Sequence, residues 1–349
     1  MFIKNAWYMA AWAHEVSDGL LARTLCNESV VLFRDETTKR VAALQNRCCH
    51  RAAPLHFGQV VPEGLECGYH GMVFDATGKC VRIPGQATIP AKARVRSYPV
   101  AEKDEIIWIW MGDPELADPA KLVSYPYHND HAKWPHKHQM YRVKANYMLL
   151  VDNLMDLTHL AFVHKNTIGG NPKAHVEAKM TVTPRDDGLH FIRWLMESAP
   201  PPTYLKAVDL AERIDRWMEF QYIAPGTVTQ WTGGINSGQG ATENRDQPGF
   251  SLRIFHGLTP ETDTTCFYFW SAANGYRQSD PQATEELYGE IDKAFNEDKA
   301  IVEAQQAVLL ESGEQGLVDT LSDAARIHMR RTVKRLIEAE TPSPVDIPS

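Results

Sequence analysis

A group of cysteines and histidines in one short segment constrains the fold of this chain more than any other feature. The segment RCCHRAAPLHFGQVVPEGLECGYHG contains Cys48, Cys49 and His50, followed by Cys67 and His70. The whole chain has only six cysteines, and three of them lie here, interleaved with histidines. Such tight spacing indicates a metal site rather than a chance grouping of buried cysteines and surface histidines.

The ligand types leave two kinds of metal centre to compare. Cys48-x-His50 and Cys67-x2-His70 offer two sulfur and two nitrogen donors, which suit zinc or a [2Fe–2S] centre with two Cys on one iron and two His on the other. A C-x-H pair does not have the spacing of zinc fingers, whereas C-x-H followed by C-x2-H is the Rieske spacing. The segments CxHR and CGYHG closely resemble the two cluster loops of Rieske proteins.

One residue departs from that pattern. Rieske proteins usually have proline between the first Cys and His, and this chain has Cys49 there. The spacing to His50 selects Cys48 as the ligand, so we expect Cys49 to be a small loop filler. The segment RIPGQ, residues 82–86, is expected to supply a proline loop that covers the cluster.

A second group of polar residues lies in the apolar segment VDNLMDLTHLAFVHKN. We predict a helix over residues 148–164, with Asn153, Asp156 and His159 on one face. Burying such groups without partners costs several kcal/mol, so a ligand or a network is needed. His164 lies about 140° around the helix from His159, so the helix must end or distort between them to bring both imidazoles to one metal.

A late helix, predicted over residues 284–311, offers a carboxylate to complete this group. Its apolar stripe contains Ile291, Ala294, Phe295, Ile301, Val302, Ala304, Val308 and Leu309. Asp298 lies in the middle of the stripe, and Glu297 lies about 100° away toward solvent. Two His and a carboxylate are the facial triad of non-haem Fe(II). The alternative is a buried salt bridge or a helix cap.

Length and patterning predict two domains in an α+β chain. The 349 residues exceed the size at which one core stops growing. Hairpin-like runs fill the first part, and alternating runs over residues 176–275 indicate an antiparallel sheet. We predict an all-β domain over residues 1–115, a catalytic domain over 116–340 and a flexible tail over 341–349.

Charge and cysteine content narrow the possible partners. The net charge of −8 makes nucleic acid an unexpected partner. The sequence shows no signal peptide and no apolar run of about 20 residues, so we expect no membrane span and a cytoplasmic location. The cysteines are too few and too unevenly spaced for a secreted disulfide scaffold.

Together, the two metal-binding patterns resemble those of the Rieske non-haem iron oxygenases. The similarity extends over nearly the whole chain, through KNAWYMAAW, RCCHRAAPL, IWIWMGDPELADPA, VDNLMDLTHLAFVH and NEDKAIVEAQQ. These segments look like the branch of vanillate O-demethylase, dicamba O-demethylase and toluenesulfonate methyl-monooxygenase. This resemblance implies an N-terminal Rieske β-domain, a C-terminal helix-grip catalytic domain and a homotrimer.

The same resemblance implies roles for individual residues. His159, His164 and Asp298 would bind mononuclear Fe(II), while Cys48, His50, Cys67 and His70 would hold the [2Fe–2S] cluster. Asp156 would bridge from His159 to His70 of a neighbouring subunit, and Asn153 is grouped with it as catalytic. Electrons would come from NAD(P)H through a separate reductase carrying FMN and a plant-type [2Fe–2S] centre.

The implied reaction uses O2 to hydroxylate or demethylate a methyl or methoxy group of an aromatic acid. Two alternatives stay open. One is a ring-hydroxylating dioxygenase that acts on an aromatic carboxylate. The other is a Rieske-type electron carrier or zinc module without oxygenase activity, which the second metal-binding pattern disfavours.

The expected substrate contacts are less sharply defined. His256 matches a histidine that contacts the substrate carboxylate in the dicamba-type relatives, although it could equally be a sheet-edge residue. Gln230, Trp231 and Asn236 are further candidates. Arg253 lies three residues before His256, so a regular strand would place them on opposite faces, and only a bulge would bring Arg253 into the pocket. The glycines of KNTIGGNPKAH, after His164, suit a mobile lid.

Overall fold

A computed structural model describes residues 1–17 and 19–340, which form two compact units. Unit 1 comprises Met1–Ser124 with Thr259–Asp263, and unit 2 comprises Tyr125–Leu258 and the described residues from Thr264 onward. Unit 1 therefore extends beyond the boundary expected at residue 115. The 3-10 turn η4 (Pro119–Lys121) remains with unit 1 because the Trp7 indole donates to the Asp118 carbonyl over 2.9 Å. The tail expected over 341–349 lies outside the described residues.

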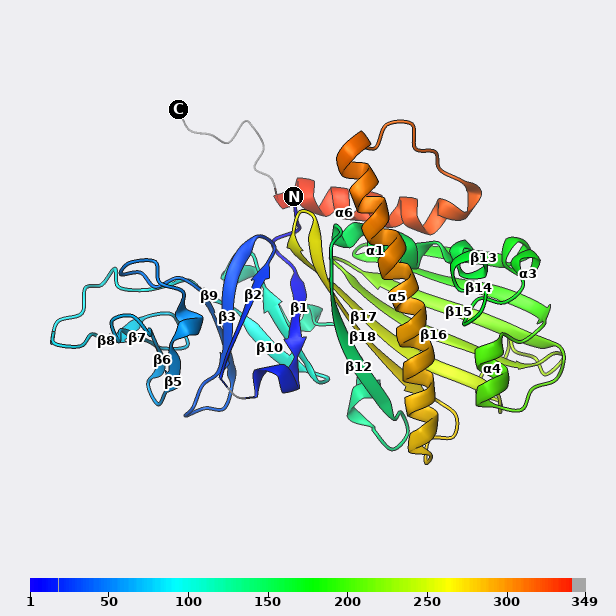
Figure 1. Cartoon of the computed structure of the whole chain (residues 1–349), viewed down its shortest axis with the longest axis horizontal. Helices are drawn as coiled ribbons and strands as arrows, with labels where there is room; N and C mark the ends of the chain where they lie inside the picture. Colours follow the sequence, from blue (N-terminus) through cyan, green and yellow to red (C-terminus); the bar gives the residue numbers. More distant parts are fainter. Residues whose placement is uncertain (18, 341–349) are drawn as a thin grey trace. The chain divides into compact units, whose positions relative to one another are not determined.

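Unit 1 consists of three antiparallel sheets (Figure 1). The first has the order β1-β11-β10, the second β2-β3-β4-β9 and the third β5-β6-β7-β8. Their strands are β1 (Trp7–Trp12), β2 (Leu20–Leu25), β3 (Glu28–Arg34), β4 (Val41–Gln45), β5 (Gln59–Val61), β6 (Gly64–Glu66), β7 (Val73–Phe74), β8 (Cys80–Arg82), β9 (Ser97–Tyr98), β10 (Val100–Lys103) and β11 (Ile106–Trp110). One apolar core in this unit includes Phe33, Leu44, Phe74 and the two cysteines Cys48 and Cys67.

Two glycines let the chain cross itself closely in the third sheet. A Cβ atom on Gly58 would lie 1.8 Å from the Glu66 carbonyl oxygen, and one on Gly68 would lie 2.3 Å from the Phe57 carbonyl oxygen. No side chain fits at these distances. The segment that follows the first Cys–His loop and the beginning of the second loop are therefore held against each other by direct backbone contact.

Unit 2 is built on one seven-stranded antiparallel sheet of order β12-β18-β17-β16-β15-β14-β13. Its strands are β12 (His136–Val143), β13 (Lys179–Arg185), β14 (Gly188–Ser198), β15 (Ile214–Ile223), β16 (Thr227–Asn236), β17 (Phe250–Thr262) and β18 (Thr265–Asn274). The helices are α1 (Tyr147–Met155), α2 (Leu160–Val163), α3 (Pro172–Glu177), α4 (Pro202–Ala207), α5 (Pro281–Ser312) and α6 (Ala324–Glu340). Figure 1 shows α5 lying across the sheet. This arrangement agrees with the expected antiparallel sheet covered by helices.

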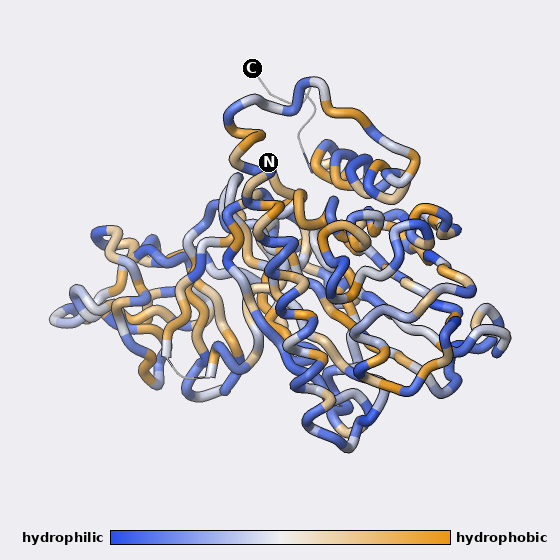
Figure 2. The backbone as a smooth tube through the Cα atoms, turned by 45° about the vertical axis from the view of Figure 1, so that its right-hand side comes forward, coloured by the Kyte–Doolittle hydropathy of each residue, from blue (hydrophilic) through white to orange (hydrophobic). Residues whose placement is uncertain are grey.

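The long helix α5 begins and ends as its sequence dictates. The Asp280 carboxylate accepts from the Gln282 amide, Pro281 occupies the first turn, and Gly313 follows the last turn with φ 71°. Orange and blue residues alternate along it in Figure 2, as expected of a helix with one apolar face. The buried residues are Ala283, Thr284, Leu287, Ile291, Ala294, Phe295, Asp298, Val302 and Gln306.

The buried face of α5 differs from the expected apolar stripe in its last third. Ile301, Ala304 and Val308 are exposed, because the buried face narrows to one residue per turn after Asp298. Asp298 itself is buried, as expected from its place in the pattern.

The continuous helix expected over 148–164 is interrupted at Asp156. Its backbone is extended there, with φ −125° and ψ 102°, and its carboxylate caps a new turn by accepting from the Thr158 amide over 2.9 Å. The chain then forms η6 (Leu157–His159) and α2 before His164 ends the helix. Asn153, Asp156 and His159 are therefore not on one helix face, because an aspartate favours capping over a helix interior.

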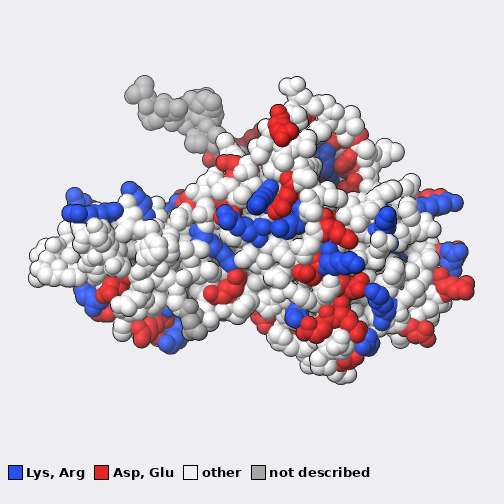
Figure 3. Space-filling model, viewed as in Figure 1, with Lys and Arg blue, Asp and Glu red and all other residues white. Residues whose placement is uncertain are grey.

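The surface charges are mixed. On the face of unit 2 that carries α5, Lys and Arg side chains lie among Asp and Glu side chains (Figure 3). Within residues 1–17 and 19–340, none of the helices combines the length and apolar character needed to cross a bilayer.

The backbone crossing predicts a specific defect. Gly58→Ala should push the two loop-bearing segments apart and destabilise unit 1 by about 1–3 kcal/mol, the usual cost of overpacking. Thermal unfolding and the iron and sulfide content per chain measure this effect. Gly289→Ala is the matched control, because nothing lies within 4 Å of its Cβ position in α5. It should stabilise the chain by about 0.5–1 kcal/mol. Equal behaviour of the two variants would contradict the role of the crossing.

Candidate functional site

Two loops of unit 1 share one backbone construction. In the first, the Cys48 amide donates to the Ala53 carbonyl over 2.8 Å, and the Ala52 amide donates back to the Cys48 carbonyl over 3.0 Å. The second loop repeats both bonds from Cys67 and Gly71, at the same distances. Ala52 and Gly71 both have positive φ angles, 57° and 68°. The two loops are therefore matching hairpin-like supports, each presenting one Cys and one His.

The loops bring the four expected cluster ligands together. Cys48 and Cys67 are buried in the core of unit 1 and interact with each other. The exposed rings of His50 and His70 lie 4.6 Å apart, centre to centre. Two thiols on the buried side and two imidazoles on the exposed side are the donor set of a Rieske [2Fe–2S] cluster. The residues present therefore fit that group.

The proline segment 82–86 and Cys49 lie beside the loops. A Cβ atom on Gly71 would lie 3.0 Å from the Cγ of Pro84, so the proline segment packs against the second loop. Cys49 is an exposed thiol, whereas the other five cysteines of the chain are buried. Its exposure separates it from the buried pair of thiols.

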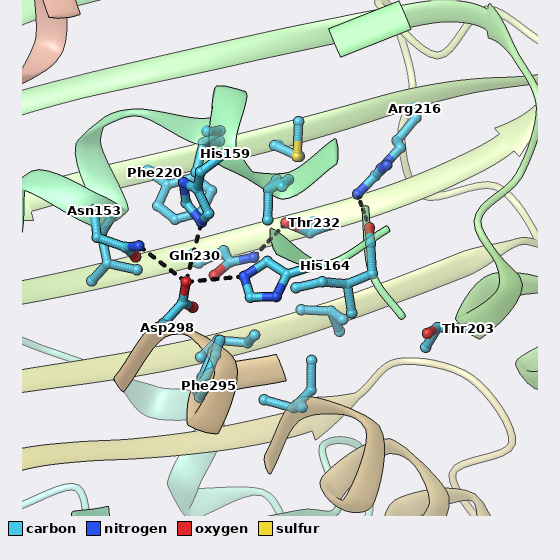
Figure 4. Close-up of a pocket in the computed structure, with 18 of the residues that line it drawn as sticks. Asn153, His159, His164, Thr203, Arg216, Phe220, Gln230, Thr232, Phe295 and Asp298 are labelled. Atoms are coloured by element: carbon cyan, nitrogen blue, oxygen red, sulfur yellow. Dashed lines mark hydrogen bonds and ion pairs between the residues drawn. The ribbon is translucent and has the colours of Figure 1, made fainter. Parts of the chain in front are cut away.

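The second group converges in unit 2. His159 and His164 direct their Nε2 atoms to the same oxygen of Asp298, at 3.4 Å and 3.0 Å (Figure 4). One potential ligand atom from each of the three residues lies within 4.8 Å of the others. The break at Asp156 and the end of α2 at His164 make this possible, and Asp298 reaches the same point from α5. The arrangement has the donors of a 2-His-1-carboxylate site.

The opposite ring nitrogens are also engaged. The His159 Nδ1 donates to the Asp156 carbonyl over 2.6 Å, and the His164 Nδ1 donates to a Glu297 carboxylate oxygen over 2.8 Å. These bonds orient both rings and leave each Nε2 facing Asp298, as supporting partners of metal-binding histidines do. The residues present therefore fit a divalent iron ion.

Electrostatics favour positive charge at this point. Burial lowers the pKa of His159, and the Asp298 carboxylate opposes that shift. Burial would also lower the pKa of His164, but its hydrogen bonds to Asp298 and Glu297 raise it overall. The carboxylates thus stabilise a cation bound between the imidazoles.

Two further residues support the three. Asn153 donates from Nδ2 to the shared Asp298 oxygen over 3.0 Å, which holds the carboxylate in place. Glu297, which the sequence placed toward solvent, is only half-exposed and is the partner of His164. Sequence reasoning missed this role, although a second carboxylate beside the buried one was a usable signal.

The Asp156 side chain faces another direction. One carboxylate oxygen accepts from the Thr158 amide and hydroxyl, and the other accepts from the Ser322 hydroxyl over 3.2 Å. Its link to His159 is made by the backbone carbonyl rather than by the carboxylate.

A mainly apolar cavity opens beside the three residues. It is bounded by α1, α2, α4, α5 and the inner face of the sheet. Phe220, Leu252 and Phe295 are among its apolar walls, and Gln230 and Arg216 are among its polar ones. The sequence did not single out Arg216, although its alternation with Met218 and Phe220 along β15 was a usable signal.

The pairing of β16 with β17 places the expected substrate contacts on two different faces of the sheet. Gln230 lines the cavity, and His256 lies behind it, donating from Nε2 to the Gln230 carbonyl over 3.0 Å and accepting at Nδ1 from the Tyr268 hydroxyl over 2.9 Å. Trp231 pairs with Arg253 on the opposite face of the sheet, where the guanidinium lies 3.7 Å from the indole centre. No bulge interrupts this pairing, so the prediction that Trp231 and Arg253 line the pocket is wrong.

Asn236 is also away from the cavity. It ends β16, and its side-chain oxygen accepts from the Ala211 amide over 2.8 Å, which closes a loop. Among the expected substrate contacts, Gln230 is therefore the one that lines the cavity.

Comparison with known proteins also divides the chain into two domains. Residues 6–99 match the Rieske [2Fe-2S] domain, and residues 143–339 match the vanillate O-demethylase oxygenase C-terminal domain. The chain is 39% identical over 343 residues to the toluene-4-sulfonate monooxygenase system iron-sulfur subunit of Comamonas testosteroni, covering 97% of this chain and 98% of the relative.

Solved structures of dicamba monooxygenase have the same fold. The structure bound to dicamba superposes with a TM-score of 0.87 at 32% identity, covering 97% of this chain and 98% of the other. A second structure, with non-heme iron and dicamba, has a TM-score of 0.78 at 30% identity, covering 97% and 98%.

The support of His164 by Glu297 leads to a prediction. Glu297→Ala should weaken iron binding about 10- to 100-fold, because the ring loses its orienting acceptor. Competition with a chelator measures the affinity, and the visible absorbance of the cluster provides an internal reference for the amount of folded chain. Glu285→Ala is the control, since Glu285 also lies on α5 but pairs with Lys137 on the surface. Unchanged iron affinity in Glu297→Ala would refute this support.

The buried His256 predicts an acid-dependent loss of stability. Burial lowers its pKa to about 3, so the folded chain holds it neutral while the unfolded chain takes up a proton below about pH 6.5. Its contribution to the free energy of unfolding is therefore present above pH 6.5 and falls as the pH drops toward 3. Urea unfolding monitored by tryptophan fluorescence at about pH 7.5 and about pH 5 should show a smaller pH dependence in His256→Gln. Parallel pH dependences would show that His256 is not held neutral.

Proposed function

The chain belongs to the oxygenase components of the Rieske non-haem iron monooxygenases, in the branch of toluene-4-sulfonate monooxygenase and vanillate O-demethylase, and we propose that it hydroxylates a methyl or methoxy group of an aromatic acid. The observation that carries this proposal is the convergence of His159, His164 and Asp298 on the wall of an apolar cavity. The cosubstrate would be O2, and the electrons would come from NAD(P)H through a separate reductase. The name "oxygenase component" of the dicamba O-demethylase relative supports a separate reductase.

We assign the metal groups to the residues that fit them. Cys48, His50, Cys67 and His70 would hold the [2Fe–2S] cluster, and the three residues of unit 2 would hold Fe(II). When bound, the cluster supplies single electrons and the iron supplies the site of O2 activation.

The overall reaction balances with one oxygen atom going to the substrate. A methyl substrate, O2, NADH and a proton give the benzylic alcohol, NAD⁺ and water. A methoxy substrate is hydroxylated in the same way to a hemiacetal, which collapses to a phenol and formaldehyde. The reductase has to deliver two electrons for each substrate molecule converted.

The residues of the chain orient the reacting groups and exclude water. Asn153 holds the Asp298 carboxylate, and the Asp156 carbonyl holds the His159 ring, so the three donors keep one geometry. Walls such as Phe220 and Phe295 offer apolar area for an aromatic ring and leave little room for solvent beside it. His256 acts as a positioning residue, because it fixes the Gln230 amide at the cavity wall.

We further propose a homotrimer, in which Asp156 would link His159 to His70 of a neighbouring copy. The exposed rings of His50 and His70 support this role. Apolar side chains after α5 are also exposed, with Leu317, Val318 and Leu321 at 69%, 83% and 101%. Such an apolar surface is typical of an interface.

A ring-hydroxylating dioxygenase remains the second candidate. Its donor set is the same, and the dicamba-type fold does not by itself separate the two reactions. Only the products distinguish them, because demethylation releases formaldehyde and dihydroxylation does not.

Product analysis tests the proposal. The reductase-coupled enzyme is given vanillate, p-toluenesulfonate, isophthalate and benzoate, and formaldehyde, NADH loss and product mass are measured together. Formaldehyde in step with NADH loss, or the gain of one oxygen atom at a methyl group, is the expected outcome. Gain of two hydroxyl groups on the ring without formaldehyde would favour the dioxygenase. NADH loss without any aromatic product would overturn both.

A further inference from the structure

A buried arginine without an acidic partner lies in the wall of the cavity. Arg216, on β15, has an exposed fraction of 3%. Its Nε donates to the Tyr204 hydroxyl over 3.0 Å, Nη1 to the Gly169 carbonyl over 2.9 Å and Nη2 to the Ile168 carbonyl over 3.0 Å. All three acceptors are neutral.

The positive charge of Arg216 is therefore not neutralised by the chain. Within residues 1–17 and 19–340, no carboxylate forms an ion pair with it. A guanidinium has five N–H groups, so two remain after these three bonds, one on each terminal nitrogen. Burying an unpaired charge is costly, and neutral acceptors only partly offset the lost hydration. A bound anion would complete the pair.

A second arginine on the same strand pair shows the contrast. Arg193, on β14, faces the same side of the sheet, because it pairs with Met218, two residues along β15 from Arg216. It is also buried, and it donates to the His175 carbonyl. The Asp156 carboxylate attracts it electrostatically, and it does not line the cavity. Burial and backbone support are therefore common to both arginines, while the open charge at the cavity belongs to Arg216.

The position of Arg216 suits one end of an aromatic substrate. Figure 4 shows it on the opposite side of the pocket from Asp298. Beside it, the Tyr204 and Phe250 rings stack at 3.7 Å and form part of the same wall. The cavity thus has a metal-binding side, an aromatic wall and a cationic side.

We propose that Arg216 is the residue that selects an anionic substrate, by pairing its free N–H groups with the carboxylate or sulfonate of a benzene ring whose methyl or methoxy group faces His159, His164 and Asp298. This inference rests on the proposed function and specifies its substrate class. The planar guanidinium matches two oxygens of either anion at once. A substrate that carries the anion on one side of the ring and the methyl or methoxy group on another would contact both sides of the cavity.

Calorimetric binding to the anaerobic holoenzyme tests the proposal without turnover. Two pairs of isosteres are compared: p-toluenesulfonate with methyl p-tolyl sulfone, and 4-methylbenzoate with 4-methylbenzamide. In Arg216→Gln, we expect the anions to bind about 10- to 100-fold more weakly, the range for losing a hydrogen bond to a charged group, while the neutral isosteres change less than about threefold. Arg216→Lys should retain part of the preference for the anion, because the charge remains.

Arg193→Gln is the matched control. It also removes a buried guanidinium that supports the segment after His164, so a purely structural role would make the two variants alike. If Arg216→Gln leaves the ratio of the dissociation constants of the anion and its neutral isostere unchanged, the proposal is overturned. If Arg216→Gln does not fold, Arg216→Lys decides: an anion preference smaller than that of the wild type supports the proposal, and an unchanged anion preference overturns it.

The outcomes also separate this inference from the proposed function. Selective loss of anion binding in Arg216→Gln without any methyl or methoxy product in the wild type would retain the anion site and reject the reaction. Product formation with an anion preference that does not depend on Arg216 would retain the reaction and reject the anion site.

Discussion

The catalytic unit depends on keeping one carboxylate buried on an apolar helix face. Asp298 lies among Ile291, Phe295 and Val302, where an unpaired charge would be strongly unfavourable. Three groups face it, namely the Nε2 atoms of His159 and His164 and the side-chain amide of Asn153. All three lie between the start of α1 and the residue that follows α2, and they reach Asp298 because this segment does not continue as one regular helix.

In unit 1, backbone geometry places the candidate cluster ligands. Each Cys–His loop is closed by the same pair of amide–carbonyl bonds, and the positive φ angle falls on Ala52 in one loop and on Gly71 in the other. The adjoining segments cross where Gly58 and Gly68 have no side chain. Main-chain contacts therefore hold both pairs of candidate ligands in place.

In the sheet of unit 2, the alternation of side chains along each strand decides which polar residues face the cavity. Along β15 and β16, alternate residues such as Arg216 and Gln230 face the cavity, while Trp231 and its partner Arg253 form an aromatic–cationic cluster on the other face. His256 lies on the inner side but acts through Gln230. The distribution of charge in the pocket thus follows from strand register, and it leaves the guanidinium of Arg216 as the open cation at its wall.

Local patterns in the sequence predicted the two groups of candidate ligands, the two antiparallel parts, the long helix over most of α5 and the burial of Asp298, because each of these depends on spacing within one segment. The interruption at Asp156, the support of His164 by Glu297 and the choice of Arg216 over Arg253 required the tertiary structure. A capping aspartate is indistinguishable from a helical one until its acceptor is known, and the face of a strand is set by pairing with its neighbours. Long-range pairing therefore decided which of several plausible polar residues reach the cavity.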